Sequence, residues 1–420
     1  MPDPAPAPVP FGPDNPHPLF GRRTELVWDG KYDEYGRRRP VDIAGSAMPM
    51  QKIETVDMPR SEALASGQTT FGDLRTTRLD DFRNLLIWGD NKLVMASLLK
   101  DFRGKIDLIY IDPPFDVGAD FTMQVGIGEG KENAEKDQSL LEMVAYRDMW
   151  GKGTDSYLHM MYERFTLMKE LLSEKGCIYV HCDWRVNSLI RVVLDEIFGS
   201  NNFRNIIIWY YGQRTSIKMN FFDRKHDDII FYSKTDKLKL FETSIPWSRD
   251  EFIMHRHDVM TDENGREYIL TDGGLGRPRY RRYVDEVVSA GKPLDSVWNI
   301  PILNSSAKER TGYATQKPEA LLERIVNASS NEGDLVADFF CGSGTTGAVA
   351  ERLGRRWIMC DLGRYAIHTS RKRMIELQRR LQADGQPYRA FHVCNLGRYE
   401  RQWWQRERLQ GYDRDHRSVV

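Results

Sequence analysis

Short apolar runs alternate with amphipathic stretches along most of the chain. Buried strands are predicted from the runs "NLLIW", "KIDLIYI", "CIYVHC", "LVADFF" and "RRWIMC". Helices are predicted between them, as in "SYLHMMYERFTLMKELLSEKG", where apolar residues recur at helical spacing and the final glycine is expected to cap the helix. Strands that alternate with helices indicate an α/β fold, a doubly wound sheet with parallel strands. "HDDIIFYSK" is expected to be the antiparallel neighbour of "NIIIWYY".

One stretch interrupts this alternation. Residues 235–303 contain short mixed segments, turns such as "DENG" and the basic "GRPRYRRY", which indicate an inserted recognition module. A chain of 420 residues exceeds the usual size of one compact core, so a main domain with an insertion is expected. The predicted division is a proline-rich disordered tail over 1–20, an N-terminal extension over 21–80, a first half of the main domain over 81–234 with a loop insertion at 116–156, the module over 235–303, a second half over 304–395 and a polar C-terminal tail over 396–420.

Composition narrows the class of protein without identifying a function. The formal net charge is −1, so no general attraction to polyanions is expected. No apolar run approaches the roughly 20 residues that span a bilayer. The N-terminal "MPDPAPAPVPFGPDNPHP" lacks the basic start and apolar core of a secretory signal, so a cytoplasmic location is expected. The five cysteines form no CxxC pair, which favours buried reduced thiols over disulfides or a metal site.

A glycine-rich turn lies between a predicted strand and a predicted helix in "LVADFFCGSGTTGAVAERLG". Gly342, Gly344 and Gly347 match G-x-G-x-x-G, and Asp361 ends a second strand about 20 residues on. Glycines let the backbone turn tightly and approach a ligand, and the acid can accept hydrogen bonds from ribose hydroxyls. The pattern predicts an adenosine-containing cofactor, and by itself it does not distinguish NAD from S-adenosylmethionine (AdoMet). A turn that serves only strand–helix packing is the weaker alternative.

The stretch "YIDPPF" ends a predicted buried strand in an acid, two prolines and an aromatic ring. Ligands bind at the carboxyl edge of a parallel sheet, so Asp112 is expected to face the same crevice as the glycine loop. Asp112 and the Pro113 carbonyl are acceptors without a competing proline N–H, which suits an NH2 group. They can localise the lone pair of a nucleobase amine toward an electrophile, while Phe115 stacks on the base. Hydride transfer to NAD does not need this arrangement, and a plain proline turn is the simpler alternative.

The two motifs together resemble those of amino-group DNA methyltransferases. "DPPF" at 112–115 resembles their catalytic motif, and "FCGSG" at 340–344 resembles their AdoMet-binding F-x-G-x-G. The catalytic motif comes first and a divergent module separates the two, an order that resembles the circularly permuted β class and the Mod subunits of type III restriction systems. The resemblance covers about 85–382, apart from the module and the loop after Phe115. It implies a Rossmann-like, AdoMet-dependent sheet with a catalytic half, an AdoMet-binding half and an inserted target-recognition module.

The resemblance also assigns site residues, one by one. The catalytic motif comprises Asp112 and the Pro113 carbonyl on the target amine, Pro114, and Phe115 on the flipped base, where the family usually has tyrosine. The AdoMet pocket is implied to comprise Asp338, Phe340, Gly342, Gly344 and Thr345, with Asp361 on the ribose, Asp90 on the adenine ring, and Thr315, Gln316 and Lys317 at the methionine end. Lys317 is expected to pair with the methionine carboxylate.

Several of these residues have a plain structural alternative. Asp90 is equally interpreted as a strand-end cap, and a helix N-terminus accounts for the segment 315–317 as well. His181 and Asp183 of "VHCDWR" also end a strand, where they could face the pocket, but they are interpreted as structural, because a histidine at a strand tip is often a satisfied polar group.

An acid in the first motif position is typical of adenine-N6 enzymes in this family, whereas serine is typical of cytosine-N4 enzymes. The resemblance therefore favours a site-specific enzyme that methylates adenine N6 in double-stranded DNA after base flipping, aided by closure of the loop at 116–156. Cytosine-N4, RNA, and a DNA-specificity subunit of a restriction–modification complex are the alternatives. The basic stretch of the module is predicted to contact DNA through Arg277, Arg279, Arg281 and Arg282. A homodimer and a nuclease/helicase restriction partner both stay open.

Overall fold

The computed structural model describes residues 25–43, 45–56, 82–114, 153–212, 222–241, 244–254, 256, 258–274, 277–304 and 306–396, together with the backbone of 123–126 and 133–136. Phe115 and most of the predicted loop at 116–156 lie outside the described residues, as do the tails over 1–20 and 397–420. The backbone of β4 (Met123–Gly126) pairs antiparallel with that of β5 (Asn133–Lys136).

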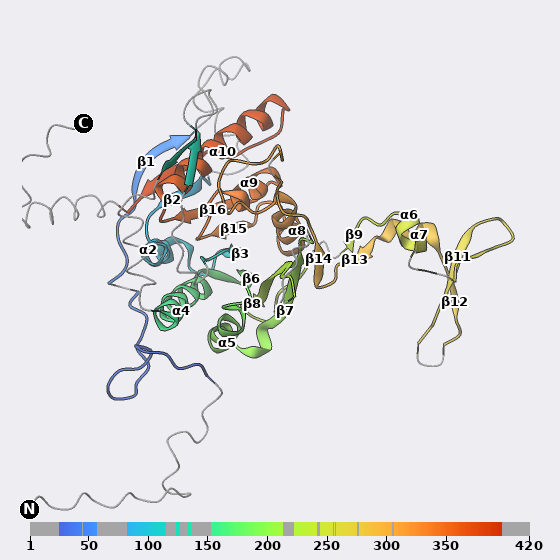
Figure 1. The fold of residues 1–420 in the computed structure, drawn as a ribbon, viewed down its shortest axis with the longest axis horizontal. Helices are drawn as coiled ribbons and strands as arrows, with labels where there is room; N and C mark the ends of the chain where they lie inside the picture. Colours follow the sequence, from blue (N-terminus) through green and yellow to red (C-terminus); the bar gives the residue numbers. More distant parts are fainter. Residues whose placement is uncertain are drawn as a thin grey trace, which may run out of the picture.

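A ten-stranded sheet forms the centre of the molecule (Figure 1). Its strands are β1 (Gln51–Val56), β2 (Asn84–Trp88), β3 (Ile106–Ile111), β6 (Leu172–Cys182), β7 (Phe203–Tyr210), β8 (His226–Ser233), β14 (Val297–Asn299), β15 (Leu335–Asp338), β16 (Arg356–Asp361) and β17 (Phe391–Asn395). The order across the sheet is β1-β17-β2-β16-β15-β3-β6-β8-β7-β14. Strands β1 and β8 run against the other eight, and β8 pairs with β7 as predicted.

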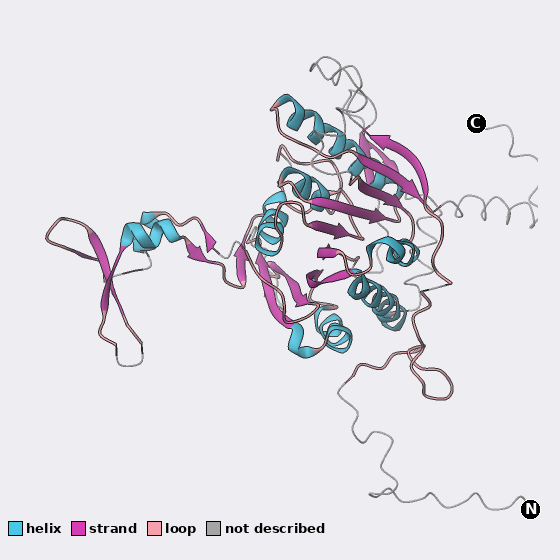
Figure 2. Cartoon of the chain, turned by 180° about the vertical axis from the view of Figure 1, so that it is seen from behind, coloured by secondary structure: helices cyan, strands magenta, loops and turns pink. Residues whose placement is uncertain are grey.

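Helices cover both faces of this sheet (Figure 2). One face carries α2 (Asn91–Phe102), α4 (Thr154–Leu171) and α5 (Asn187–Phe198), and the other carries α8 (Glu319–Ser329), α9 (Thr345–Arg352) and α10 (Arg364–Ala383). Successive strand residues point to opposite faces. Ile109 and Ile111 therefore pack in the core under the first group, whereas Leu108 and Tyr110 pack under the second. The predicted doubly wound α/β fold is confirmed.

The junction between α4 and β6 differs from the sequence prediction. The helix ends at Leu171 and β6 begins at the next residue, so Gly176 lies within the strand and does not cap the helix. A Cβ atom at Gly176 would lie 2.8 Å from the carbonyl oxygen of Ile106 on the neighbouring strand β3. The glycine therefore permits a close approach of two strands, which helical periodicity alone does not reveal.

A smaller unit projects from the sheet between β8 and β14 (Figure 1). We call residues 244–293 the projecting module. It contains β9 (Ser244–Ile245), α6 (Arg249–Met254), β10 (Met260–Thr261), β11 (Glu267–Thr271), β12 (Tyr280–Tyr283), α7 (Val284–Ala290) and β13 (Lys292–Pro293). Strands β10, β11 and β12 form a sheet, and the described core of the module is Phe252, Ile269, Val284 and Val287. Strand β14, inside the predicted range 235–303, joins the main sheet beside β7, and the domain boundaries stay predictions.

The N-terminal extension contributes to the main domain. Strand β1 pairs with β17 at one edge of the sheet, and buried Trp28 donates from Nε1 to His159 of α4 across 3.5 Å. A short 3-10 helix, η2 (Ser200–Asn202), links α5 to β7. All five cysteines are buried and unpaired, as predicted. In the part of the chain that the structure describes, every helix is too short or too polar to cross a membrane.

Candidate active site

The carboxyl ends of three neighbouring parallel strands meet at the centre of the sheet. Strand β3 lies between β15 and β6, with Ala337 opposite Ile109 and Val180 opposite Ile111. The next residues beyond these pairs are Asp338 on β15, Asp112 after β3 and His181 on β6. The structure therefore brings the two predicted motifs to one sheet edge, where parallel α/β folds bind their ligands.

Asp112 is held by two basic side chains. Its side chain is 19% exposed, and Oδ2 forms an ion pair with Nζ of Lys317. Oδ1 lies 3.3 Å from Nδ1 of His181. Pro113 and Pro114 follow, and neither has an N–H that could compete for these oxygens. The carboxylate is thus an oriented hydrogen-bond acceptor at the sheet edge.

Lys317 belongs to a loop that leads into α8 and is braced by Gln316. Oε1 of Gln316 accepts hydrogen bonds from the N–H and Oγ1 of Thr311, each 2.8 Å long, and its Nε2 donates to the carbonyl of Glu309. Thr345 Oγ1 donates to the carbonyl of Lys317 across 3.3 Å. Thr315 is exposed. In this structure the ammonium of Lys317 binds the catalytic-motif carboxylate, a contact that the sequence did not suggest.

The glycine loop runs from the end of β15 into α9. Gly344 has φ of +73°, and a Cβ atom there would lie 2.7 Å from Oγ of Ser370. This backbone conformation and the short distance both require glycine. Thr345, the first residue of α9, is buried and accepts a 2.9 Å hydrogen bond from the guanidinium of Arg373. Phe340 is partly buried against the core beneath α2.

Two acids of the predicted pocket fix the backbone of this loop. Asp338 is buried and accepts hydrogen bonds from Oγ1 of Thr346 and from the N–H of Phe340. Its burial raises the pKa of the carboxyl to about 7, although these hydrogen bonds act in the opposite direction. Asp361, at the end of β16, accepts 2.8 Å hydrogen bonds from the N–H groups of Gly342 and Gly363. The carboxylate therefore holds the turn that would approach a nucleoside.

Asp90 has the geometry of a helix cap. Oδ1 accepts a 2.7 Å hydrogen bond from the N–H of Lys92 at the start of α2. The same carboxylate lies 3.3 Å from the guanidinium of Arg164, a buried residue of α4. The capping alternative is confirmed, and its contact with an adenine ring stays a prediction.

Sequence reasoning did not find Tyr313 at this edge, and it interpreted His181 as structural. Tyr313 stacks on Tyr365 with ring centroids 5.8 Å apart and planes at 10°. A Cβ atom at Gly342 would have the Tyr313 ring as its nearest neighbour. His181 contacts Asp112, whereas Asp183 accepts from the N–H of Arg185 in a turn. Strand parity was the available signal for His181, because it lies beside Asp112 and faces the same side of the sheet.

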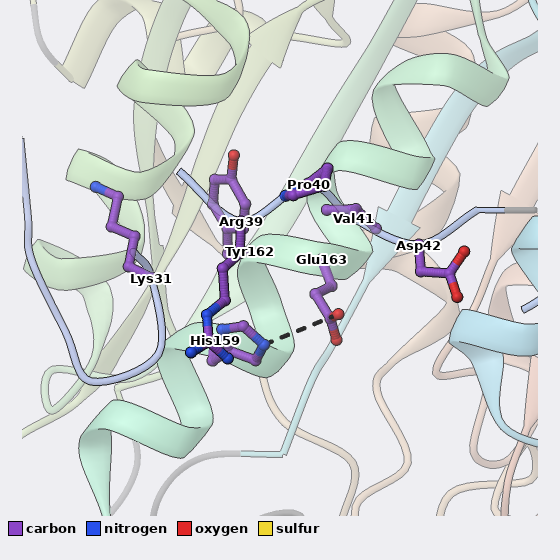
Figure 3. Close-up of a pocket in the computed structure, with 8 residues that line it drawn as sticks. All are labelled: Lys31, Arg39, Pro40, Val41, Asp42, His159, Tyr162 and Glu163. Atoms are coloured by element: carbon purple, nitrogen blue, oxygen red, sulfur yellow. Dashed lines mark ion pairs between the residues drawn. The ribbon is translucent and has the colours of Figure 1, made fainter. Parts of the chain in front are cut away.

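One cavity outside the sheet edge, of about 190 Å³, lies between the N-terminal extension and α4 (Figure 3). Three of its charged side chains, Lys31, His159 and Glu163, have charged partners in the chain. Figure 3 shows Glu163 beside His159, 3.9 Å away, and Glu163 also binds Lys92 of α2 across 2.6 Å. Lys31 binds Glu196 of α5 across 2.8 Å. The Lys31–Glu196 pair anchors the extension to α5, and the contact of Trp28 with His159 anchors it to α4, so the cavity is a structural junction.

The arrangement at the sheet edge fits AdoMet. The glycine loop allows the backbone to approach a ligand closely. Asp361 ends the neighbouring strand, the position from which an acid accepts hydrogen bonds from a ribose in such folds. The carboxylates of Asp112 and Asp90 bring negative charge to the same edge, which suits a ligand with a cationic sulfonium. The fold and site thus define a Rossmann-like enzyme that uses AdoMet.

Comparison with known proteins identifies the family. Residues 106–372, more than half of the chain, match the N6/N4 DNA methylase family. The type II methyltransferase M.EcaI of Enterobacter cloacae is 30% identical over 85% of this chain and 78% of its own length. The DNA adenine methyltransferase YhdJ of Escherichia coli K12 is 26% identical over 71% and 85%, respectively. The type III Mod subunit StyLTI of Salmonella typhimurium is 26% identical over 66% of this chain and 52% of its own length. The chain belongs to the N6/N4 DNA methylase family and is an AdoMet-dependent DNA methyltransferase.

Proposed function

We propose that the chain transfers a methyl group from AdoMet to N6 of adenine within a specific site in double-stranded DNA, after the base is flipped out of the duplex. The observation that carries this proposal is the position of the Asp112 carboxylate, which contacts Lys317 and His181 beside the glycine loop at one sheet edge. An acid in this motif position, and a relative named as an adenine methyltransferase, favour adenine over cytosine.

Asp112 and the Pro113 carbonyl act on the target amine as acceptors. The lone pair of an exocyclic amine is delocalised into its ring, so the amine is a poor nucleophile. Acceptors that hold its two hydrogens direct the lone pair out of the ring plane, without the need for a strong base. AdoMet supplies the electrophilic methyl group. Phe115, with Pro114 setting the turn before it, stacks on the flipped base.

The remaining site residues form the cofactor pocket in this proposal. Gly342, Gly344, Thr345 and Phe340 shape the loop against which AdoMet lies, supported by Asp338. Asp361 accepts hydrogen bonds from the ribose and Asp90 from the adenine amine. Lys317 pairs with the methionine carboxylate, and Thr315 and Gln316 line that end of the pocket. Lys317 contacts Asp112 in this structure, so in this proposal its ammonium group interacts with two carboxylates, that of Asp112 and that of the methionine moiety.

The projecting module recognises DNA in this proposal. Arg277, Arg279 and Arg282 are exposed, and among the described residues they form no ion pair and no ring contact. Arg281 differs from them, because its guanidinium lies 4.7 Å from the ring of Tyr268. Unpaired arginines beside tyrosines suit contacts with phosphates and bases. We assign the three unpaired arginines the main part of DNA binding.

The assembly and location are also part of the proposal. The StyLTI Mod subunit is named as part of a type III restriction–modification enzyme, but this chain matches only 52% of its length. A homodimer and a restriction (nuclease/helicase) subunit are therefore assemblies to measure, by light scattering of the chain with and without DNA. We place the enzyme in the cytoplasm, together with its DNA substrate.

The proposal is tested by incubating the purified chain with methyl-labelled AdoMet and mixed-sequence duplex DNA, followed by mass spectrometry of the digested nucleosides. We expect labelled N6-methyladenine. Labelled N4-methylcytosine would leave the acceptor chemistry in place and contradict the choice of base. Label in RNA alone, in a parallel incubation, would contradict DNA as the substrate.

A further inference from the structure

A histidine joins the carboxylate of the catalytic motif to a second carboxylate. Nδ1 of His181 lies 3.3 Å from Oδ1 of Asp112, and Nε2 lies 3.2 Å from Oδ2 of Asp227 on β8. The His181 side chain is fully buried, whereas that of Asp227 is 22% exposed. His181 therefore lies between Asp112 and Asp227 at the sheet edge. The function described so far gives His181 and Asp227 no role.

The sheet itself aligns these side chains. Asp112 follows β3, His181 ends β6, and Asp227 begins β8, which is antiparallel to β6. Tyr110, Tyr179 and Ile229 belong to the core beneath α8 to α10, and by the alternation of strands Asp112, His181 and Asp227 face that side too. The imidazole ring also packs edge-on against Trp209, 5.5 Å between centroids. Its orientation is therefore fixed from several elements.

The two ring nitrogens of His181 have different partners. Nε2 forms a hydrogen bond with Oδ2 of Asp227, whereas Nδ1 lies 3.3 Å from both Oδ1 of Asp112 and the hydroxyl of Tyr110. Burial acts to raise the pKa of Asp227, but the hydrogen bond and charge of His181, the charge of Lys317 and a hydrogen bond from Tyr211 lower it overall. Asp227 is therefore an ionised acceptor for Nε2–H.

Charged and polar groups surround His181. Asp112 and Asp227 lie on either side of the ring, and Lys317 forms an ion pair with Asp112. Tyr110 places its hydroxyl 3.3 Å from Nδ1, and Tyr211 places its hydroxyl 3.4 Å from Asp227. The ring therefore lies between two carboxylates, each of which has a further partner in the chain.

We propose that His181, with Asp227 behind it, is a positioning residue for the methyl transfer. His181, 3.3 Å from Oδ1 of Asp112, fixes the orientation of that carboxylate and thereby the direction of its free lone pairs. Those lone pairs accept the hydrogens of the target amine. This inference rests on the proposed role of Asp112 and adds the two residues that set its geometry.

The main test is the variant Asp227→Asn, which removes the charge behind the ring with little change of shape. Single-turnover methyl transfer is measured across pH, with AdoMet affinity by calorimetry and DNA affinity by anisotropy. Near pH 8 we expect a loss on the order of 10- to 100-fold in rate, with both affinities within about twofold of wild type. A loss in rate without a loss in either affinity is the result expected when the acceptor is misdirected.

Asp228→Asn is the matched control. It makes the same change one residue along β8, where the side chain points to the other face and binds Asn187 of α5. We expect a rate within about twofold of wild type at every pH, as for ordinary surface substitutions. Equal losses in Asp227→Asn and Asp228→Asn, or a wild-type rate in Asp227→Asn, would contradict the inference.

Two further measurements cover the remaining outcomes. His181→Asn should lose activity at all pH values, and retained wild-type activity in this variant would contradict the positioning role. If it does not fold, the comparison of Asp227→Asn with Asp228→Asn still tests the claim. A wild-type chain that makes no N6-methyladenine would refute the proposed function, whereas an active wild type with an unaffected Asp227→Asn variant would refute only the positioning role.

Discussion

The candidate active site and the projecting module use charge in opposite ways. At the sheet edge, Asp112, Asp338 and Asp361 each have fixed hydrogen-bond partners within the chain. In the module, Arg279 and Arg282 are exposed and, among the described residues, form no ion pair. The first arrangement holds a geometry before any substrate arrives, whereas the second leaves positive charge available for a partner. Chemistry needs the first, and binding to phosphates needs the second.

The module also contains arginines that are not available in this way. Arg266 binds Asp285 and Glu286, and Arg249 binds Glu267 with two hydrogen bonds. These pairs are exposed, so salt and water screen them. They connect strand β11 and helices α6 and α7 within the module. The module thus separates arginines that hold its shape from arginines that face solvent.

The largest expected effect comes from removing the acceptor at the sheet edge. Asp112→Ala should lower methyl transfer by on the order of 10³-fold, because the target amine loses the group that directs its lone pair. Asp112→Asn keeps one acceptor oxygen and should lose less. AdoMet affinity, measured by calorimetry, should stay within a few-fold of wild type in both. Near-normal turnover of Asp112→Ala would show that the held carboxylate is not part of the chemistry.

A smaller effect is expected from the unpaired arginines of the module. The double variant Arg279→Ala/Arg282→Ala should weaken DNA binding by about tenfold at moderate salt. The slope of log affinity against log salt should fall by about 2, since each lost phosphate contact contributes about 0.9. Titrations of labelled duplex at several salt concentrations provide both quantities.

The matched control for that variant is Arg249→Ala/Arg266→Ala. It removes the same two charges from the same module, but from arginines that already bind acids. We expect its salt slope to stay close to that of wild type. If both double variants lose affinity and slope equally, the module binds DNA through its net charge, and the distinction between paired and unpaired arginines fails.

Much of the fold followed from local patterns in the sequence. The continuous apolar run "IDLIYI" and the helical spacing of "NSLIRVVLDEIF" predict β3 and α5, because a central parallel strand is buried on both faces and a surface helix on one. The glycine motif and Asp361 also followed from the sequence, since spacing along the chain fixes a strand–turn–helix unit. These predictions depend on neighbours close in sequence.

Contacts between distant segments did not follow from the sequence. Lys317 reaches Asp112 across 205 positions, and His181 reaches Asp227 across 46. Lys317 reaches Asp112 from the loop before α8, which contacts Thr345 of the glycine loop. The register of β3, β6 and β8 places His181 beside Asp112 and Asp227, and no local periodicity encodes that register. Gly176 was assigned to a helix end for the same reason, because its strand partner Ile106 lies far away in sequence.

The two regions should also respond to pH with opposite sign. Burial raises the pKa of Asp338 from its ordinary value of 3.8 to about 7, so folding favours its neutral form. That contribution to stability is complete below about pH 4 and is lost as the pH rises toward and through 7. In the module, a hydrogen bond from Arg249 lowers the pKa of Glu267, and one from Arg266 lowers that of Asp285. Their contributions are present at neutral pH and are lost in acid, below about pH 4.

Asp338→Asn tests the buried half of this contrast. The amide stays neutral at every pH, so the fall in thermal midpoint between about pH 5 and pH 8 should be smaller than in wild type by a few degrees. Glu351→Gln is the companion variant, because burial also raises the pKa of Glu351, a residue of α9, to about 7. The oxygens of Glu351 accept hydrogen bonds from Trp357, Asn84 and Arg389. This variant should reduce the same fall while leaving AdoMet affinity unchanged. An unchanged fall in both variants would mean that these acids are ionised in the folded protein, and that the sheet edge holds its charges much as the module does.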